Sequence, residues 1–157
     1  MIIGRVVRQE DVLNMYNKGW YIMSLYMDAV VVKGTRRIFG CTVNTKTQNE
    51  AKDEFAPLDL TPYSVRFRVL GSATADAKVL LEKIITQTTD EESIGIINDA
   101  ENGQFEFVIN IADTQLLGLG KFAIMIELLD ANTLEPQVTL TEGGHNGEFN
   151  KLQVVQC

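Results

Sequence analysis

Histidine and cysteine, the side chains that most often carry nucleophilic or acid–base chemistry near neutral pH, are rare in this chain. The 157 residues include one histidine, His145, and two cysteines, Cys41 and Cys157. His145 lies in the segment Gly143-Gly144-His145-Asn146-Gly147, and no Gly-x-Ser-x-Gly elbow accompanies it. This pattern predicts a flexible loop rather than a Ser-His-Asp or Cys-His device. We expect no catalytic residues.

Two acidic stretches have the composition of a site for a hard cation, which prefers several oxygen ligands close together. The first contains Asn98, Asp99, Glu101 and Asn102, but the bidentate glutamate of a calcium loop is missing at the twelfth position. Asn102-Gly103 is ordinary turn composition, so we predict a hairpin turn there. Asp90-Glu91-Glu92 is expected to be hydrated, and two cysteines with one histidine do not make a tetrahedral zinc site. The sequence predicts neither a metal nor a cofactor.

Two further motifs allow both a functional and a structural interpretation. Gly118-Leu119-Gly120-Lys121 has the wrong spacing for a phosphate loop, and the next residues predict a strand rather than a helix. Aromatic side chains gather early in the chain, where they fit either a sugar site or protein interface, or the core: Tyr16, Trp20, Tyr21 and Tyr26. We favour the core.

Composition limits the classes of partner. Hydrophobic residues make up 45% of the chain and charged residues 22%, which is typical of a globular domain with a substantial core. The formal net charge is −7, so phosphate backbones and anionic membrane surfaces are repelled on average, and we expect neither nucleic-acid nor membrane binding. We also expect no signal peptide, synthesis in a reducing cytoplasm, and a buried Cys41.

The elements that position these residues are predicted to be strands. The stretch from 98 to 130 contains two long alternating runs, 105–111 and 121–128, separated by a polar break at 112–115. We interpret this pair as the centre of an antiparallel sandwich. Further strands are expected at 21–32, 37–43, 64–70, 79–86, 94–97, 138–140 and 149–154, with a loop from Asn44 to Pro57. We predict a core of Phe39, Val65, Phe67, Val69, Phe105, Phe107, Ile109, Phe122, Ile124 and Ile126.

Residues 1–20 have a different pattern and are assigned to an N-terminal attachment segment, with a sandwich domain from 21 to 157. Acidic residues at 10–11 and an Asn17-Lys18-Gly19 stop predict one helix of about two turns, too short to be stable alone. Its apolar residues are therefore candidates for binding a partner: Ile3, Val6, Val12, Leu13, Tyr16 and Trp20.

A series of short motifs occurs in this order along the chain: Lys33-Gly34-Thr35, Leu58-Asp59-Leu60-Thr61 before Ser64–Val69, Asn102-Gly103-Gln104-Phe105-Glu106-Phe107, Ala112–Leu117, Gly120-Lys121-Phe122 and Gly147-Glu148-Phe149. Together these motifs resemble an immunoglobulin-like module found at the N-terminus of phage baseplate upper proteins. The resemblance covers about residues 21–155. It implies an all-β, immunoglobulin-like antiparallel β-sandwich, here with a short N-terminal extension containing one helix.

The same resemblance implies a non-enzymatic structural protein of a bacteriophage particle. We expect a component of the baseplate or tail, or a head-fibre or capsid-decoration protein. Its expected location is the virion, its expected partners are other virion proteins, and a homo-oligomer, with a trimer among the options, is expected. The alternative is an immunoglobulin-like module that binds a host surface or a carbohydrate through exposed loops.

Overall fold

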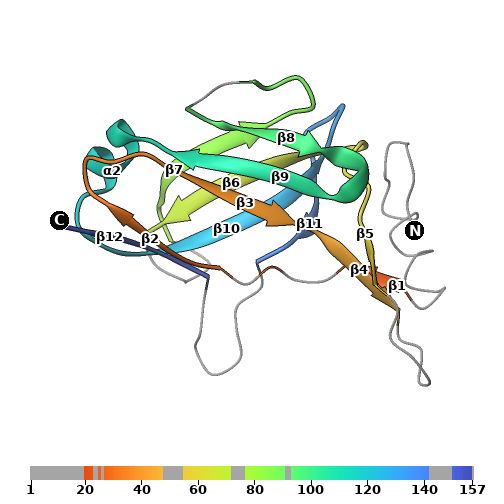
Figure 1. Ribbon diagram of the computed structural model, residues 1–157, viewed down its shortest axis with the longest axis horizontal. Coiled ribbons are helices and arrows are strands. Elements are labelled where there is room, and N and C mark those ends of the chain that lie inside the picture. Colours follow the sequence, from red (N-terminus) through yellow and green to blue (C-terminus); the bar gives the residue numbers. More distant parts are fainter. Residues whose placement is uncertain are drawn as a thin grey trace.

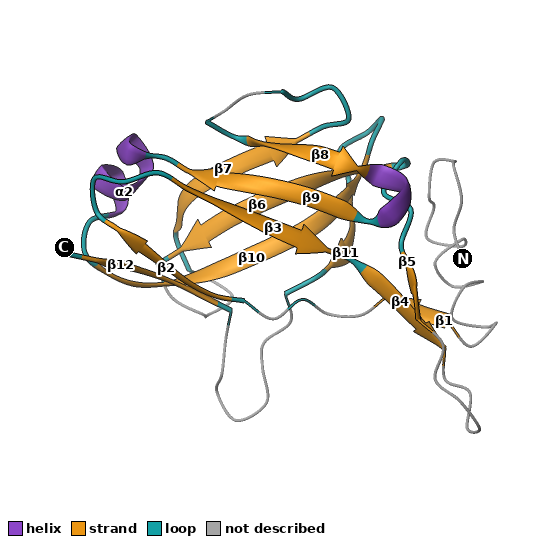
Figure 2. Cartoon of the chain, in the orientation of Figure 1, coloured by secondary structure: helices purple, strands orange, loops and turns teal. Residues whose placement is uncertain are grey.

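The computed structural model describes residues 20–22, 25, 27–47, 55–71, 77–90, 93–141 and 150–156. The predicted N-terminal helix, His145, Phe149 and Cys157 lie outside these ranges. The described part is mostly β-strand, arranged in three sheets with one α-helix and one 3-10 turn (Figures 1 and 2), so the all-β prediction is confirmed.

The largest sheet is built around its longest strand. It contains β2 (Asp28–Val32), β12 (Lys151–Val155), β10 (Gly120–Asp130), β6 (Tyr63–Leu70) and β7 (Val79–Ile85) in that order, with β11 (Pro136–Thr139) also on β10. One edge of β10 pairs with β6 along its length. The other edge pairs first with β12 and then with β11. This arrangement makes β10 the central strand of the sheet.

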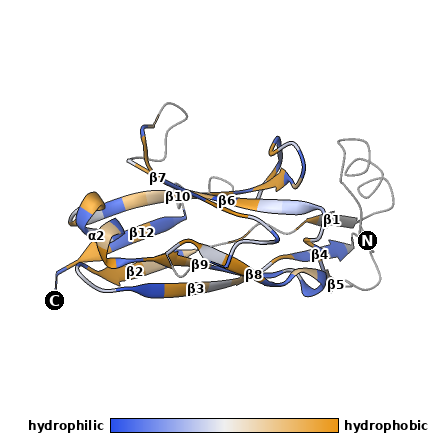
Figure 3. Cartoon of the chain, turned by 90° about the horizontal axis from the view of Figure 1, so that it is seen from above, coloured by the Kyte–Doolittle hydropathy of each residue, from blue (hydrophilic) through white to orange (hydrophobic). Residues whose placement is uncertain are grey.

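A second sheet faces the first. It contains β3 (Arg37–Thr42), β9 (Gln104–Ile109) and β8 (Gly95–Asp99), all antiparallel, and Figure 3 shows it as a separate layer from β6, β7 and β10. The 3-10 turn η1 (Ala100–Asn102) joins β8 to β9, and helix α2 (Ile111–Leu117) follows β9. Alternate residues of the two sheets point into the space between them, which is where the core forms.

A small third sheet extends beyond the sandwich at the end away from α2 (Figure 1). It consists of β1 (Trp20–Ile22), β4 (Asn44–Thr47) and β5 (Phe55–Pro57). Only Val43 separates β3 from β4, so β4 carries the line of β3 outward. β1 begins at Trp20, so the boundary expected between residues 20 and 21 falls inside this strand, which pairs with β4.

The core matches the alternation of the sequence. Of the ten predicted core residues, eight are buried, and Phe39 and Phe122 are partly buried against them. Its centre is a stack of rings that joins the two sheets. The ring centroids of Phe67 on β6 and Phe107 on β9 lie 4.2 Å apart, and Phe39 on β3 lies 5.2 Å from Phe107. Offset contacts of this kind add to the energy of burial.

Two details of this central region differ from the prediction. The runs at 105–111 and 121–128 form β9 and β10, which are the middle strands of opposite sheets and do not pair with each other. The polar break between them is helix α2, which begins at Ile111 and crosses from one sheet to the other. Asn110 starts this helix: its side chain accepts from the Asp113 N–H, while the Asp113 carboxylate accepts from the Asn110 N–H, each at 2.9 Å.

The remaining differences concern pairing at the edges. The segment from Asn44 to Pro57, expected to be a loop, contains β4 and β5, and the predicted strand at 21–32 is two strands, β1 and β2. The parallel pairing of β2 with β12 departs from the purely antiparallel prediction. Since β2 and β12 lie near opposite ends of the chain, no tight hairpin constrains their direction.

Truncation of Phe107 tests the central stack. Phe107 is fully buried between two other rings, so Phe107→Ala should lower the free energy of unfolding by roughly 3–5 kcal/mol. Phe55→Ala is the matched control, because Phe55 is 61% exposed, and it should change stability by about 0.5 kcal/mol or less. Urea unfolding of the three proteins measures both values. Equal midpoints for Phe107→Ala and the parent would show that the ring stack does not hold the sheets together.

Candidate functional site

The structure describes little of the predicted partner-binding set. Ile3, Val6, Val12, Leu13 and Tyr16 lie outside the described residues. Trp20 begins β1, where its backbone pairs with Thr47 of β4. Of the aromatic set, Tyr16 and Tyr26 are not described, and Trp20 and Tyr21 are described only as backbone. Their assignment to a core or an interface therefore stays a prediction.

The acidic stretch from Asn98 to Asn102 forms the predicted hairpin. Asn102 Nδ2 donates to Asp99 Oδ2 at 2.8 Å, and Gly103 closes the turn with φ +70°. A Cβ at Gly103 would lie 2.4 Å from the Val43 carbonyl oxygen, so both conformation and space require glycine. Among the described residues, no group of three or more His, Cys, Asp or Glu side chains is placed to hold a metal ion.

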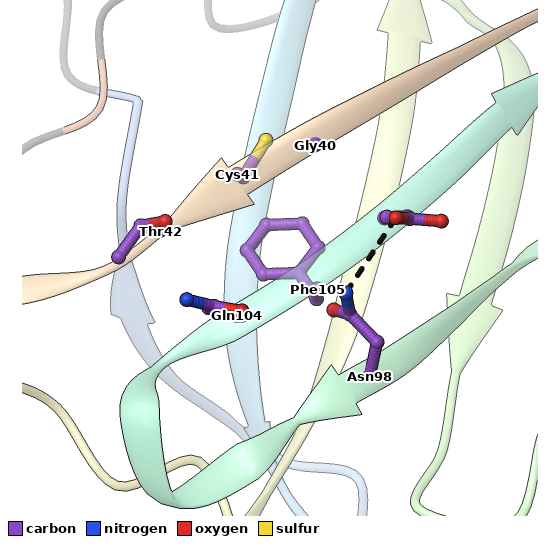
Figure 4. A pocket seen from close by; sticks show the side chains of 7 residues that line it. Gly40, Cys41, Thr42, Asn98, Gln104 and Phe105 are labelled. Atoms are coloured by element: carbon purple, nitrogen blue, oxygen red, sulfur yellow. Dashed lines mark hydrogen bonds between the residues drawn. The ribbon is translucent and has the colours of Figure 1, made fainter.

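A depression opens on the outer face of the three-stranded sheet formed by β3, β9 and β8 (Figure 4). Its volume is about 240 Å³, and its lining comes from all three strands: Gly40, Cys41, Thr42, Asn98, Gln104, Phe105 and Glu106. Gly40 lies opposite Glu106, and Thr42 lies opposite Gln104. These residues face outward, while Cys41 and Phe105 alternate with them and are buried in the core. The accessible side chains of the depression are therefore polar.

A β-bulge in β8 sets the position of Asn98. Ile96 pairs with Glu106 and Asp99 with Gln104, so β8 has one more residue than β9 over this interval. Asn98 consequently lies between the rows of Glu106 and Gln104 rather than opposite either of them. Its Nδ2 is 3.5 Å from Glu106 Oε1. The bulge brings the Asn98 amide next to the Glu106 carboxylate, a proximity that the sequence did not predict.

Cys41 lies beneath this depression as a buried neutral thiol. Burial raises its pKa from 9.0 to about 12, because the thiolate would lose its hydration in the core. Its side chain is 9% exposed, which confirms the expectation that Cys41 is a small buried hydrophobe. A thiol in this state is a poor nucleophile.

A buried ion pair that was not predicted from the sequence lies between the sheets. The Lys83 ammonium, on the inward face of β7, donates to the Asp113 carboxylate on α2. It also donates to the carbonyls of Ser93 and, at 2.6 Å, Val108. Three acceptors satisfy its three N–H groups. Since Leu81 and Ile85 flank Lys83 at the inward positions, the alternation of β7 already indicated that this lysine needs a buried partner.

Other charged side chains pair across the outer face of the larger sheet. Arg66 on β6 contacts Glu127 on β10 at 2.7 Å, and Arg68 contacts Glu82 on β7 at 2.8 Å. In each pair, an arginine lies directly opposite a glutamate on the neighbouring strand. Their geometry assigns them to sheet stabilisation.

The comparisons with known proteins add no assignment. Neither the models of known protein families nor the curated proteins contain a match to this sequence. No helix in the described part of the chain has the length and apolar composition needed to cross a membrane.

Removal of one partner tests the buried ion pair. Lys83→Met leaves the Asp113 carboxylate buried without its cation, and should lower the free energy of unfolding by roughly 3–5 kcal/mol. The double variant Lys83→Met/Asp113→Leu should lose less than the sum of the single variants, because neither charge is then left unpaired. Arg68→Met, which breaks a more exposed pair, is the control and should cost about 1 kcal/mol or less. Additive losses in chemical denaturation would contradict a direct coupling.

The Cys41 thiol predicts a pH dependence of stability. The unfolded chain releases this proton near pH 9 and the folded chain near pH 12, so the stability linked to it is complete below pH 9 and is lost between pH 9 and 12. Cys41→Ala should remove this part of the alkaline decline, measured by urea unfolding at a series of pH values. In a Cys157→Ser background, a thiol reagent at pH 8 should label Cys41 only after unfolding. Rapid labelling of the folded protein would contradict the buried state.

Proposed function

We propose that the chain is a non-enzymatic structural component of a bacteriophage particle, built on an immunoglobulin-like sandwich. It would serve in the baseplate or tail, or as a head-fibre or capsid-decoration protein. Neighbouring virion proteins, including further copies of the chain, would hold it through residues 1–20. The observation that carries the proposal is the order of the strands.

That order agrees with an immunoglobulin-like sandwich of the variable type. In such domains strands A, B, E and D form one sheet, and strands C, F and G with the added C′ and C″ form the other. Here β3, β9 and β8 take the positions of B, E and D. β12, β10, β6 and β7 take the positions of G, F, C and C′. The agreement holds in both chain order and neighbour order, which supports the fold that the sequence resemblance implies.

Three of the motifs behind the resemblance lie where the described chain turns or leads into a strand. Gly34 lies in the turn between β2 and β3, with φ +83°, and its N–H donates to Thr114 Oγ1 of α2 at 2.9 Å. Leu58 and Leu60 are fully buried just before β6. The Asn102-Gly103 motif joins β8 to β9. Such motifs act on the connections between strands, so their positions are consistent with the resemblance on which the proposal rests.

The charges of the described residues also favour a structural role. Lys83 with Asp113, Arg66 with Glu127 and Arg68 with Glu82 each pair across strands or elements. These ionisable groups are occupied in holding the sheets, which suits a protein whose task is to keep a rigid shape in an assembly. The proposed attachment segment precedes β1, and β1 lies at the end of the described chain opposite α2 (Figure 1).

Deletion of residues 1–19 tests the attachment role. The truncated chain should fold, with a melting transition close to that of the full chain, but should be absent from purified phage particles. Mass spectrometry of the particles, with copy numbers, gives this result and separates a head from a tail location. The measurement needs a phage in which the plasmid-borne chain replaces the original copy.

Point variants provide the matched controls for the deletion. Val12→Asp/Leu13→Asp places charges on the predicted apolar helix face and should abolish incorporation, whereas Asn14→Asp, off that face, should not. A truncated chain that cannot fold would assign the segment to the core. Full incorporation without residues 1–19 would place the attachment surface elsewhere on the molecule.

A further inference from the structure

We propose that the depression on the outer face of the β3–β9–β8 sheet binds a neutral carbohydrate (Figure 4). The site lies on β3, β8 and β9 and does not depend on residues 1–20. The inference therefore goes beyond the proposed structural role and stands or falls separately from it.

The space for a ligand comes from Gly40. A Cβ built at Gly40 meets no atom within 4 Å, so the surface above this residue is open. Its cross-strand partner is Glu106, whose carboxylate borders the open space. A glycine inside a strand weakens the strand and provides no side chain for packing. Here it lets a ligand approach the backbone of β3 closely.

The polar groups around this space match the hydrogen-bonding character of sugar hydroxyls. Each hydroxyl is both donor and acceptor, and the amides of Asn98 and Gln104 and the hydroxyl of Thr42 also provide both functions. The Glu106 carboxylate accepts only, and it can form charge-assisted bonds with two neighbouring hydroxyls. A polyol can therefore satisfy all four side chains at once.

The Asn98 amide and the Glu106 carboxylate form only a long, weak contact with each other. The distance of 3.5 Å between Asn98 Nδ2 and Glu106 Oε1 is longer than the usual 2.7–3.2 Å of a strong N–H···O bond. A ligand hydroxyl can accept from the amide and donate to the carboxylate without disrupting a strong internal bond. Because the β8 bulge fixes the position of Asn98, the pair is already arranged before a ligand arrives.

Charge and size narrow the ligand class. Glu106 is the one carboxylate in the lining, which contains no lysine or arginine, and the whole chain carries a net charge of −7, so anionic ligands are repelled. The Phe105 ring is buried, so the site offers no exposed aromatic face to an apolar ligand. At about 240 Å³ the depression is smaller than the roughly 300–1,000 Å³ of pockets for drug-sized ligands. One sugar unit of a surface glycan suits this space.

Titration of the full chain with sugars, followed in amide NMR spectra, tests the proposal. The probes are glucose, galactose, mannose, rhamnose, N-acetylglucosamine and N-acetylgalactosamine. At least one sugar should shift the side-chain amide signals of Asn98 and Gln104 and the backbone signal of Gly40 in a saturable way. Gly40→Val fills the open space and should abolish these shifts, and Glu106→Gln should weaken binding by about tenfold.

Two controls make the result decisive. Ile38→Val changes an exposed residue of β3 two positions from Gly40, and should leave the response unchanged. Unchanged signals in the rest of the Gly40→Val spectrum establish that this variant is folded. The proposal is overturned if none of the six sugars shifts the site, if Gly40→Val responds like the parent, or if the shifts occur at other residues. An equal response to methylammonium would also overturn it, since the site would then recognise positive charge at Glu106.

Discussion

The buried contact between Lys83 and Asp113 is the constraint on which the arrangement of the two sheets depends. Each residue is only 8% exposed, so neither charge can remain there without the other. Lys83 belongs to one sheet, whereas its acceptors belong to α2, to β9 and to the residues that lead into β8. A correct sandwich brings all of them together, and an alternative packing of the sheets leaves a buried ammonium without partners.

The same contact explains why the chain crosses between sheets where it does. Asp113 also caps α2 through the Asn110 N–H, so the helix that carries the chain from β9 to β10 is held at its first turn by the ion pair. Gly34 of the β2–β3 turn donates to Thr114, which connects a third segment to this end of the sandwich. The helix is short, and these tertiary contacts stabilise it where its own length does not.

With the interior occupied by the ring stack and the ion pair, binding chemistry is left to the outer surfaces. The outer face of the larger sheet carries paired charges, which satisfy one another. The outer face of the smaller sheet differs, because a glycine removes a side chain and a bulge repositions an amide. A rigid sandwich holds these polar groups in place at no cost in loop ordering. Such a face suits the proposed carbohydrate site.

The sequence by itself determined the main strands of the sandwich and most of the core, since alternation along 64–70, 104–109 and 121–128 requires one apolar face whichever strands pair. It also determined the turn at Asn102-Gly103, because that conformation is local. Only the tertiary structure decided that β9 and β10 lie in opposite sheets, that Lys83 meets Asp113 thirty positions away, and that Gly40, Asn98 and Glu106 border one depression. Those outcomes depend on which distant strands pair and in which register, and local periodicity carries no information about either.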